Sequence, residues 1–263
     1  MDAENIKQSL PENLAQAVAD YVWRQIHIGQ STAQVFRLAS PERNCYLKIA
    51  PRTAFAHSLL QEKLKLDWLK NRLPVPEVLL FAADEKTDFL LLSEIAGVDA
   101  SCDSLKADKA QTIGQLAKGL KIIHSLPFED CPFGARLEYK LQIAEKMMRN
   151  GLVDESDFDE IRQGKSAEDL FEELIANKPT NENLVFTHGD YCVPNVILKN
   201  GNLSGFIDWS GAGVADKYQD IALLARSVAS NFGAEWKPFL FDALNVEPDM
   251  QKIYFYNLLD EFF

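Results

Sequence analysis

The sequence has 263 residues, of which 47% are hydrophobic and 25% charged, enough for one large domain or two modest lobes with a buried core. Its 39 acidic and 27 basic residues give a formal net charge of −12, which argues against nucleic-acid binding and suits a cationic ligand. The apolar runs are far shorter than the roughly 18 residues of a membrane span, and the amino terminus lacks a signal-peptide profile. The four cysteines form no CxxC pair, so we expect reduced thiols and a cytoplasmic protein. The charge and the short apolar runs predict that neither a membrane nor a nucleic acid is a partner.

The first ninety-odd residues predict a small sheet-rich unit. A short amphipathic helix is expected over 11–23, because Leu14 and Val18 share one side. A second helix must end before Pro74, since proline cannot continue it. The further elements expected here are strands at 33–38 and 44–49, the second helix over 56–72, and strands at 77–81 and 89–94.

The remainder of the chain predicts mostly helices. Asn200 and Gly201 form a strong hairpin signal between strands at 196–198 and 203–207. The acidic stretch 154–166 has no periodicity, which is typical of a mobile loop. The boundary between the two regions is expected near residue 95, and the predicted helices are 105–125, 137–150, 167–176, 216–229, 235–243 and 251–262.

The densest polar motif is His188-Gly189-Asp190, which follows a buried strand. Asn195 lies five residues beyond Asp190, and Asp208 ends the later hairpin strand. Phosphoryl transfer needs a carboxylate to orient a hydroxyl group and oxygen ligands for Mg²⁺. These side chains alternatively cap turns and a helix. The three-part spacing favours phosphoryl transfer.

This motif resembles the catalytic loop of the aminoglycoside phosphotransferases, which are relatives of the protein kinases. The match to HGD-x₄-N and to Ile207-Asp208 is specific to that superfamily. Further segments resemble the 3′-hydroxyl-specific branch, the kanamycin and neomycin kinases, and they are 73–76, 205–208, 213–216, 220–222 and 258–263. The resemblance implies an α+β, protein-kinase-like fold with the active site in a cleft. A nucleotide-binding N-lobe with a five-strand sheet and a helix would span 1–95, and a larger helical C-lobe would span 96–263.

The same resemblance implies a reaction and its catalytic residues. The γ-phosphoryl group of ATP or GTP would pass to the 3′-hydroxyl of an aminoglycoside, with Mg²⁺ required and antibiotic resistance as the result. Asp190 would be the general base, and Asn195 and Asp208 would hold the metal. His188 would organise the loop without reacting.

Nucleotide-binding residues are predicted in the first ninety-five positions. Lys48, on a strand, and Glu62, on the helix that follows, stand in the order that kinases use for the lysine that meets the α- and β-phosphates. Each alone would be an ordinary surface charge. The resemblance implies that Tyr46 stacks on adenine and that Ser31 lies in the nucleotide-positioning loop. It also implies that residues 93–95, which include Ser93 and Ile95, form the hinge whose backbone pairs with the edge of the base.

The acceptor side is predicted from carboxylates, because each ammonium group of an aminoglycoside needs an acceptor-rich partner. Asp154 and Glu155 are interpreted as solvated charges. The residues expected to line the amino-sugar site are Asp157, Asp159, Glu160, Arg226, Asp260, Glu261 and the carboxyl-terminal Phe263.

Four positions depart from the family pattern: Gly211 stands where many relatives carry arginine, and the helix after Arg226 shows Ser227, Ser230 and Asn231 where relatives bear acidic residues. A kinase of another small hydroxyl-bearing molecule, such as a macrolide, choline or an amino-sugar, is therefore the alternative. A nucleotide-binding pseudoenzyme is disfavoured because the full catalytic set is present. A monomer or weak dimer is expected.

Overall fold

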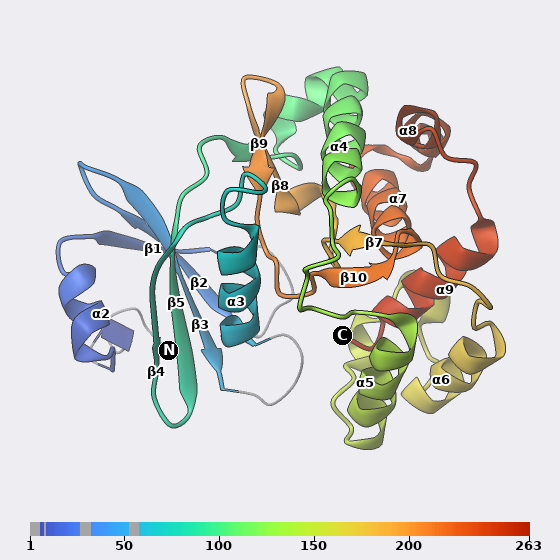
Figure 1. Ribbon diagram of the computed structural model, residues 1–263, viewed down its shortest axis with the longest axis horizontal. Helices are drawn as coiled ribbons and strands as arrows, with labels where there is room; N and C mark the ends of the chain where they lie inside the picture. Colours follow the sequence, from blue (N-terminus) through green and yellow to red (C-terminus); the bar gives the residue numbers. More distant parts are fainter. Residues whose placement is uncertain (1–5, 8, 27–32, 53–57) are drawn as a thin grey trace. The chain divides into compact units, whose positions relative to one another are not determined.

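The structure is a computed structural model, and it describes residues 6–7, 9–26, 33–52 and 58–263. The chain forms two compact units (Figure 1). The first comprises residues 1–96 together with 205–210, and the second comprises 97–204 together with 211–263. The first is rich in strands and the second is mostly helical, so the predicted α+β class is confirmed.

The first unit is built on one antiparallel sheet with the strand order β1-β2-β3-β5-β4. The predicted strands and the helix α3 are all present. Their bounds are β1 Val22–Ile26, β2 Gln34–Ala39, β3 Asn44–Pro51, α3 Leu59–Leu69, β4 Val78–Ala83 and β5 Thr87–Ser93.

Alternation along the strands decides which side chains face which side of this sheet. In β3, Cys45 and Leu47 are buried in a core cluster that also contains Leu14 of α2 (Glu12–Ala17). Lys48 alternates with Leu47 and therefore lies on the opposite face. On that face α3 contacts β3, β4 and β5 (Figure 1). Because both faces of β5 are covered, its central residues 89–92 are a continuous apolar run.

The predicted helix over 11–23 is wrong in its second half. Helix α2 ends at Ala17, and β1 begins at Val22. Val18 is buried, as the helical pattern required, but Val22 is 73% exposed at the start of its strand. The five residues of β1 include β-branched and aromatic side chains, which favour strands, and pairing with β2 decides the outcome.

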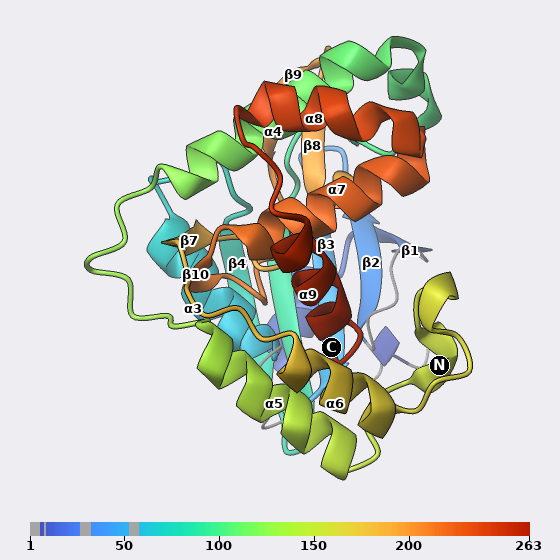
Figure 2. The same cartoon turned by 90° about the vertical axis from the view of Figure 1, so that its right-hand side faces the viewer.

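The second unit packs helices around two small sheets. Helix α9 contacts α7 and α6, α4 contacts α8, and α5 contacts α6 (Figure 2). The strand β7 pairs with β10, and β6, β8 and β9 form a separate three-stranded sheet. The helices are α4 Lys109–His124, α5 Leu137–Arg149, α6 Ala167–Ala176, α7 Tyr218–Phe232, α8 Lys237–Leu244 and α9 Met250–Asp260. The strands are β6 Val98–Asp99, β7 Leu184–Thr187, β8 Val196–Lys199, β9 Asn202–Phe206 and β10 Gly213–Asp216.

Local sequence signals explain several of these boundaries. The predicted hairpin is confirmed: Asn200 and Gly201 both have positive φ, at 52° and 73°, between β8 and β9. Ser166 and Asp169 form a capping box at the start of α6. The strand β10 was missed because its four residues begin with glycine and were assigned in part to the following helix.

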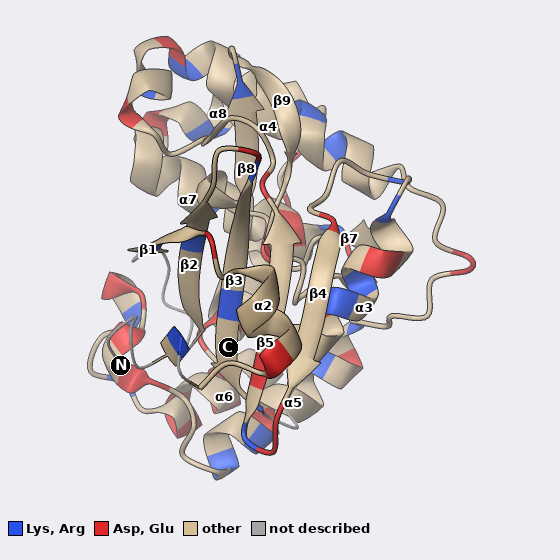
Figure 3. Ribbon diagram, turned by 90° about the vertical axis from the view of Figure 1, so that its left-hand side faces the viewer, with Lys and Arg blue, Asp and Glu red and all other residues tan. Residues whose placement is uncertain are grey.

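The acidic stretch 154–166 was expected to be a loop. It connects α5 to α6 and contains two single-turn 3₁₀ helices, at Glu155–Asp157 and Glu160–Arg162. Positions occupied by acidic and by basic residues are interspersed along the ribbon in Figure 3. Over the part of the chain that the structure describes, no helix combines the length and hydropathy that a membrane crossing demands.

Candidate active site

The His188-Gly189-Asp190 loop is held by a buried carboxylate on α7. Asp220 is fully buried, and its two oxygens accept the backbone N–H groups of His188 at 2.9 Å and of Gly189 at 2.8 Å. His124 of α4 lies 2.9 Å from the same carboxylate through Nε2. Burial opposes the charge of Asp220, but these partners outweigh it and lower the pKa of its carboxyl. The loop therefore has a fixed, charge-assisted anchor.

Asp190 is joined directly to Asn195 within this loop. The Asn195 Nδ2 group donates to the Asp190 carboxylate at 2.9 Å and to the Asp190 carbonyl at 3.0 Å. The remaining polar atom of that amide, Oδ1, is an acceptor of the kind that Mg²⁺ selects. The buried His188 lies behind the loop, where its Nδ1 accepts the Asp190 N–H at 3.3 Å. This geometry fits the organising role expected for His188.

Two of the positions that depart from the family pattern support this loop. Gly189 has a φ of +88°, and a Cβ there would lie 2.0 Å from the carbonyl oxygen of Gly211, so the two backbones pack closely. On α7, the Ser227 hydroxyl accepts the N–H of Val193 at 2.9 Å. Ser230 instead donates to the carbonyl of Arg226 in its own helix at 3.2 Å.

In the first unit, Lys48 and Glu62 form the predicted ion pair. The Lys48 Nζ lies 2.7 and 2.9 Å from the two carboxylate oxygens of Glu62, which is 1% exposed in the first turn of α3. A third group, the Asp208 carboxylate, lies 3.4 Å from the same Nζ. Burial opposes the charge of Lys48, but Asp208 and Glu62 outweigh it and raise the pKa of the ammonium group. Lys48 is thus held as a charged, oriented donor.

The segment 205–210 carries Asp208 and groups with the first unit. Asp208 has a φ of +64°, an uncommon conformation for a residue other than glycine. The turn is secured on both sides. Trp209 is fully buried and donates from Nε1 to the Phe206 carbonyl at 3.2 Å, while Lys65 of α3 donates to the Ser210 carbonyl.

The other predicted nucleotide residues lie on β3, at the end of β5 and directly after β5. Tyr46 is half-buried on β3, opposite Leu92 of β5 in the register. Ser93 ends β5, and its hydroxyl accepts the Glu77 N–H at 2.8 Å. Ile95 follows, with its side chain close enough to Gly205 that a Cβ there would lie 2.8 Å from Cδ1. Ser31 lies outside the described residues.

Three of the predicted acceptor residues form an ion-pair network in the second unit. The Arg226 guanidinium donates to Asp159 at 3.2 Å and also to Asp260. All three side chains are about one-third exposed. The network therefore joins three separate parts of the second unit: Asp159 of the acidic stretch, Arg226 of α7, and Asp260 at the end of α9.

Glu261 belongs to the same network but is buried. Its side chain is 3% exposed, and its two oxygens accept the N–H of Asp159 at 3.0 Å and the guanidinium of Arg162 at 2.9 Å. Arg162 also donates to the Asp159 carboxylate at 3.1 Å. Burial, helped by the nearby Asp159 charge, raises the pKa of Glu261 to about 7 against the opposing hydrogen bond and Arg162. The carboxylate is occupied by groups of the chain itself.

The remaining acceptor-side residues are more exposed. Asp157 and Glu160 lie exposed in and beside the 3₁₀ turns, and Phe263 is 43% exposed at the carboxyl terminus. Asp154 accepts the Ser156 N–H at 3.0 Å, and Glu155 accepts the Ala167 N–H at 2.7 Å. Asp154 thus serves a local turn, and Glu155 satisfies the first N–H group of α6.

Sequence reasoning gave no role to Asp220, Arg162 or Lys140. Asp220 was part of a segment that resembles the family, and its place two residues after a helix start was the available signal. Arg162 lies in the acidic stretch 154–166, and an arginine among acidic residues indicates an ion pair with carboxylates of the chain itself. Lys140, 8% exposed on α5, had no sequence signal.

No cluster of three or more histidine, cysteine or acidic side chains with metal-binding geometry occurs within residues 6–7, 9–26, 33–52 and 58–263. The predicted metal ligands Asn195 and Asp208 belong to different units, and both offer oxygen atoms. Hard oxygen donors suit Mg²⁺, which takes its other ligands from phosphates and water.

The comparison with known families covers most of the chain. A family model described as "Phosphotransferase enzyme family" matches residues 22–256. The chain belongs to this phosphotransferase family. An aminoglycoside 3′-phosphotransferase from Niallia circulans is 36% identical over 256 residues, which are 96% of this chain and 97% of that protein. The resemblance stated from the catalytic motif is thereby confirmed.

Solved phosphotransferase structures confirm the fold. The crystal structure of aminoglycoside-3′-phosphotransferase of type VIII has a TM-score of 0.86 at 30% identity and covers 99% of this chain, with 97% of its own length matched. An aminoglycoside phosphotransferase from Streptomyces rimosus ATCC10970, solved with ADP and streptomycin, has a TM-score of 0.81 at 24% identity. That match covers 100% of this chain and 99% of the other, and it supports the protein-kinase-like fold.

Proposed function

We propose that this phosphotransferase transfers the γ-phosphoryl group of ATP or GTP to the 3′-hydroxyl of aminoglycosides and so confers resistance to them. The observation that carries the proposal is the Asp190 carboxylate, held by Asn195 at 2.9 Å in a loop anchored by Asp220. Relatives of nearly the same length carry the name aminoglycoside 3′-phosphotransferase, which supports this acceptor over macrolides or choline.

Asp190 acts on the acceptor hydroxyl. The hydroxyl donates a hydrogen bond to the carboxylate, which orients its oxygen toward the γ-phosphorus. As the new O–P bond forms, the bond from the γ-phosphorus to the β–γ bridging oxygen breaks, and that oxygen leaves on the nucleoside diphosphate. The acceptor proton passes to Asp190. Positioning supplies most of the rate enhancement in such reactions, which is why the loop is so firmly anchored.

Lys48 acts on the nucleotide. Its ammonium, oriented by Glu62, is the donor for the α- and β-phosphates, and Tyr46 stacks on the base. Ser31, Ser93 and Ile95 complete this set in the proposal. Asn195 Oδ1 and Asp208 would hold Mg²⁺, which when bound offsets the charge of the phosphates.

The acceptor is held by exposed and half-exposed carboxylates of the second unit. We assign direct ammonium contacts to Asp157, Asp159, Glu160, Asp260 and the terminal carboxylate of Phe263. Arg226 sets the positions of Asp159 and Asp260. Glu261 acts through Arg162 and the Asp159 backbone, since both of its oxygens already have donors.

A coupled assay of ADP release, run with kanamycin, neomycin, a macrolide and choline, tests the proposal. We expect Mg²⁺-dependent turnover with kanamycin and neomycin, and product analysis should place the phosphate on the 3′-oxygen. If only the macrolide or choline is phosphorylated, that compound replaces aminoglycosides as the proposed acceptor. Running each reaction with ATP and with GTP identifies the donor. Because these nucleotides are intracellular, we further propose action in the cytoplasm, as a monomer or weak dimer.

A further inference from the structure

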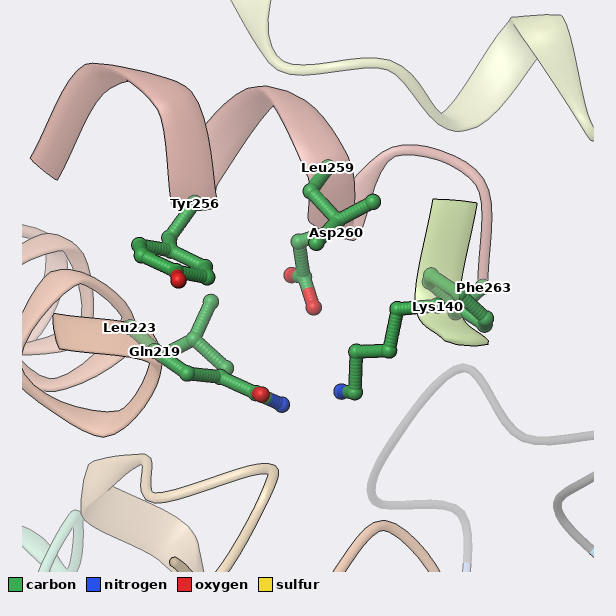
Figure 4. A pocket seen from close by; sticks show the side chains of 7 residues that line it. All are labelled: Lys140, Gln219, Leu223, Tyr256, Leu259, Asp260 and Phe263. Atoms are coloured by element: carbon green, nitrogen blue, oxygen red, sulfur yellow. The ribbon is translucent and has the colours of Figure 1, made fainter. Parts of the chain in front are cut away.

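A small pocket in the second unit lies beside the catalytic loop and contains a lysine. It is lined by Lys140 of α5, Gln219 of α7, Tyr256 and Asp260 of α9, and Phe263, together with two leucines (Figure 4). Figure 4 shows the Lys140 ammonium and the Gln219 amide pointing toward one another, with the Asp260 carboxylate directed at the space between them. Three polar groups of different charge therefore converge.

Gln219 links this pocket to the catalytic loop. Its Nε2 donates to the Gly189 carbonyl at 2.9 Å, one residue before Asp190. Because only the NH₂ group can donate to that carbonyl, the amide oxygen must face the other way. That oxygen is buried, in a residue only 4% exposed, and it accepts no hydrogen bond from any described residue. A buried acceptor without a donor indicates that a ligand or water completes it.

The Lys140 ammonium likewise lacks hydrogen-bond acceptors among the described residues. The Phe263 ring, with its centroid 5.4 Å from Nζ, is its neighbour, and the described part of the chain gives it no ion-pair or hydrogen-bond partner. Burial lowers the pKa of Lys140 to about 8, while Asp260, Asp220 and Asp190 act in the opposite direction. The group is therefore mostly charged at neutral pH and has hydrogen bonds left to donate.

The converging atoms favour one kind of ligand group. A hydroxyl can accept from the Lys140 ammonium and at the same time donate to Gln219 Oε1 or Asp260. An ammonium could donate to the two acceptors but would be repelled by Lys140 in a site of low dielectric constant. Within the pocket the Lys140 ammonium offsets the charge of the Asp260 carboxylate, so the pocket is complementary to a neutral hydroxyl, in contrast to the exposed carboxylates Asp157 and Glu160.

We propose that this pocket receives a hydroxyl of the acceptor sugar and rejects an amine there, which makes Lys140 a specificity-determining residue. The inference rests on the proposed aminoglycoside acceptor. Aminoglycosides differ from one another by the exchange of a hydroxyl for an amine at single carbons of the ring that carries the 3′-hydroxyl. Lys140 would be the group of this enzyme that distinguishes such pairs.

Two pairs of antibiotics test this assignment. Paromomycin and neomycin differ in a 6′-hydroxyl or 6′-amine, and kanamycin A and kanamycin B differ in a 2′-hydroxyl or 2′-amine. We expect the wild-type kcat/KM to favour the hydroxyl member of at least one pair by about tenfold, the equivalent of about 1.4 kcal/mol. In Lys140→Met that preference should fall at least fivefold. Lys140→Arg, which keeps the charge, should retain it.

Lys146→Met is the matched control, because Lys146 is an exposed lysine of the same helix. It should leave both preferences unchanged. Equal ratios in wild type and Lys140→Met, within twofold for both pairs, overturn the inference even if overall activity falls, since a structural lysine or a bound water would affect both members alike. Lys140→Gln gives the same comparison if the methionine variant does not fold. If wild type phosphorylates none of the four antibiotics, the proposed function itself fails.

Discussion

The two units each contain a shielded lysine, and the two lysines differ in what surrounds them. Lys48 of the first unit has two carboxylates within 3.4 Å, and its pKa is raised. Lys140 of the second unit has no ion-pair partner among the described residues, and burial lowers its pKa to about 8. Burial opposes the charge in both cases, so the partners decide the outcome.

This difference separates a group that is already oriented from one that awaits a ligand. Lys48 is fixed before any nucleotide arrives, because Glu62 holds it from the neighbouring helix. Lys140 faces a pocket with an unsatisfied amide. The acceptor side as a whole is less complete, since Asp159, Asp260 and Arg226 remain about one-third exposed. Under the proposed function, the first unit would bind an invariant ligand, the nucleotide, and the second would bind acceptors that vary.

Removal of the proposed base, Asp190 in the second unit, should have the largest effect. We expect Asp190→Ala to lower turnover by roughly 10²–10⁴, because a positioned acid–base group contributes that much. Nucleotide affinity should stay nearly unchanged, since Lys48 and Glu62 belong to the other unit. Single-turnover kinetics and nucleotide titration measure the two separately. Turnover within tenfold of wild type would remove Asp190 from this role.

Breaking the network around Arg162 tests whether the acceptor side needs a buried organiser. Arg162→Met leaves the Glu261 carboxylate buried without its guanidinium, which typically costs about 3–5 kcal/mol of unfolding free energy. The acceptor KM should rise as Asp159 loses its position. Denaturant unfolding measures the first effect. Arg149→Met, which breaks an exposed pair with Glu145 on α5, is the control and should cost less than about 1 kcal/mol. An equal loss in both variants contradicts the buried-organiser role.

Removal of a carboxylate partner of Lys48 should make this lysine resemble Lys140, which has no ion-pair partner among the described residues. Glu62→Gln removes the charge partner, so we expect the ATP KM to rise about ten- to a hundredfold, the range for one hydrogen bond between charged groups. The acceptor KM should not change. Asp67→Asn on the same helix breaks only a partly exposed pair with Lys63 and should leave both constants alone. An unchanged ATP KM in Glu62→Gln would mean that Asp208 alone orients the lysine.

The smallest expected effect is a pH dependence of the acceptor site. Glu261, whose pKa is raised to about 7, faces Asp159 and Arg162, with Arg226 and Asp260 in the same network. Its proton is gained between pH 8 and pH 6, so the network loses a negative charge and the acceptor KM should rise about two- to fivefold.

Stability should move in the opposite direction. A carboxyl group whose folded pKa lies above its unfolded value stabilises the fold fully below about pH 4.5, and this contribution is lost as the pH rises through about 7. Glu261→Gln should remove both dependences, and comparison with this variant cancels the titration of the antibiotic's own amines. The same KM profile in wild type and variant would show that another group titrates.

Local patterns predicted much of the fold and of the catalytic loop. Strand alternation, the Asn200-Gly201 turn and the proline-terminated helix before residue 74 are short-range signals, and each corresponds to an element in the structure. Asp190 and Asn195 are five residues apart, so one motif contains both. The error over 11–23 arose where helical and strand patterns compete and pairing with β2 decides.

Long-range contacts were beyond such patterns. Arg162 meets Glu261 across 99 positions, and Asp220 meets the Gly189 N–H across 31. The burial of Glu261 could not be foreseen, because a terminal glutamate next to an aspartate has the pattern of a solvated charge. Lys140 offered even less, since nothing in its helical sequence shows that its ammonium is buried.

The grouping of residues 205–210 with the amino-terminal unit has a consequence for biosynthesis. A ribosome that has made the first 96 residues has not yet supplied Trp209 or the Ser210 carbonyl that Lys65 bonds. At about 5–20 residues per second, the missing segment emerges roughly 5–20 s later. By then all five strands of the sheet have been made, but the unit lacks its segment 205–210 while much of the helical unit is synthesised. A fragment cut after Ala96 would therefore be an incomplete folding unit.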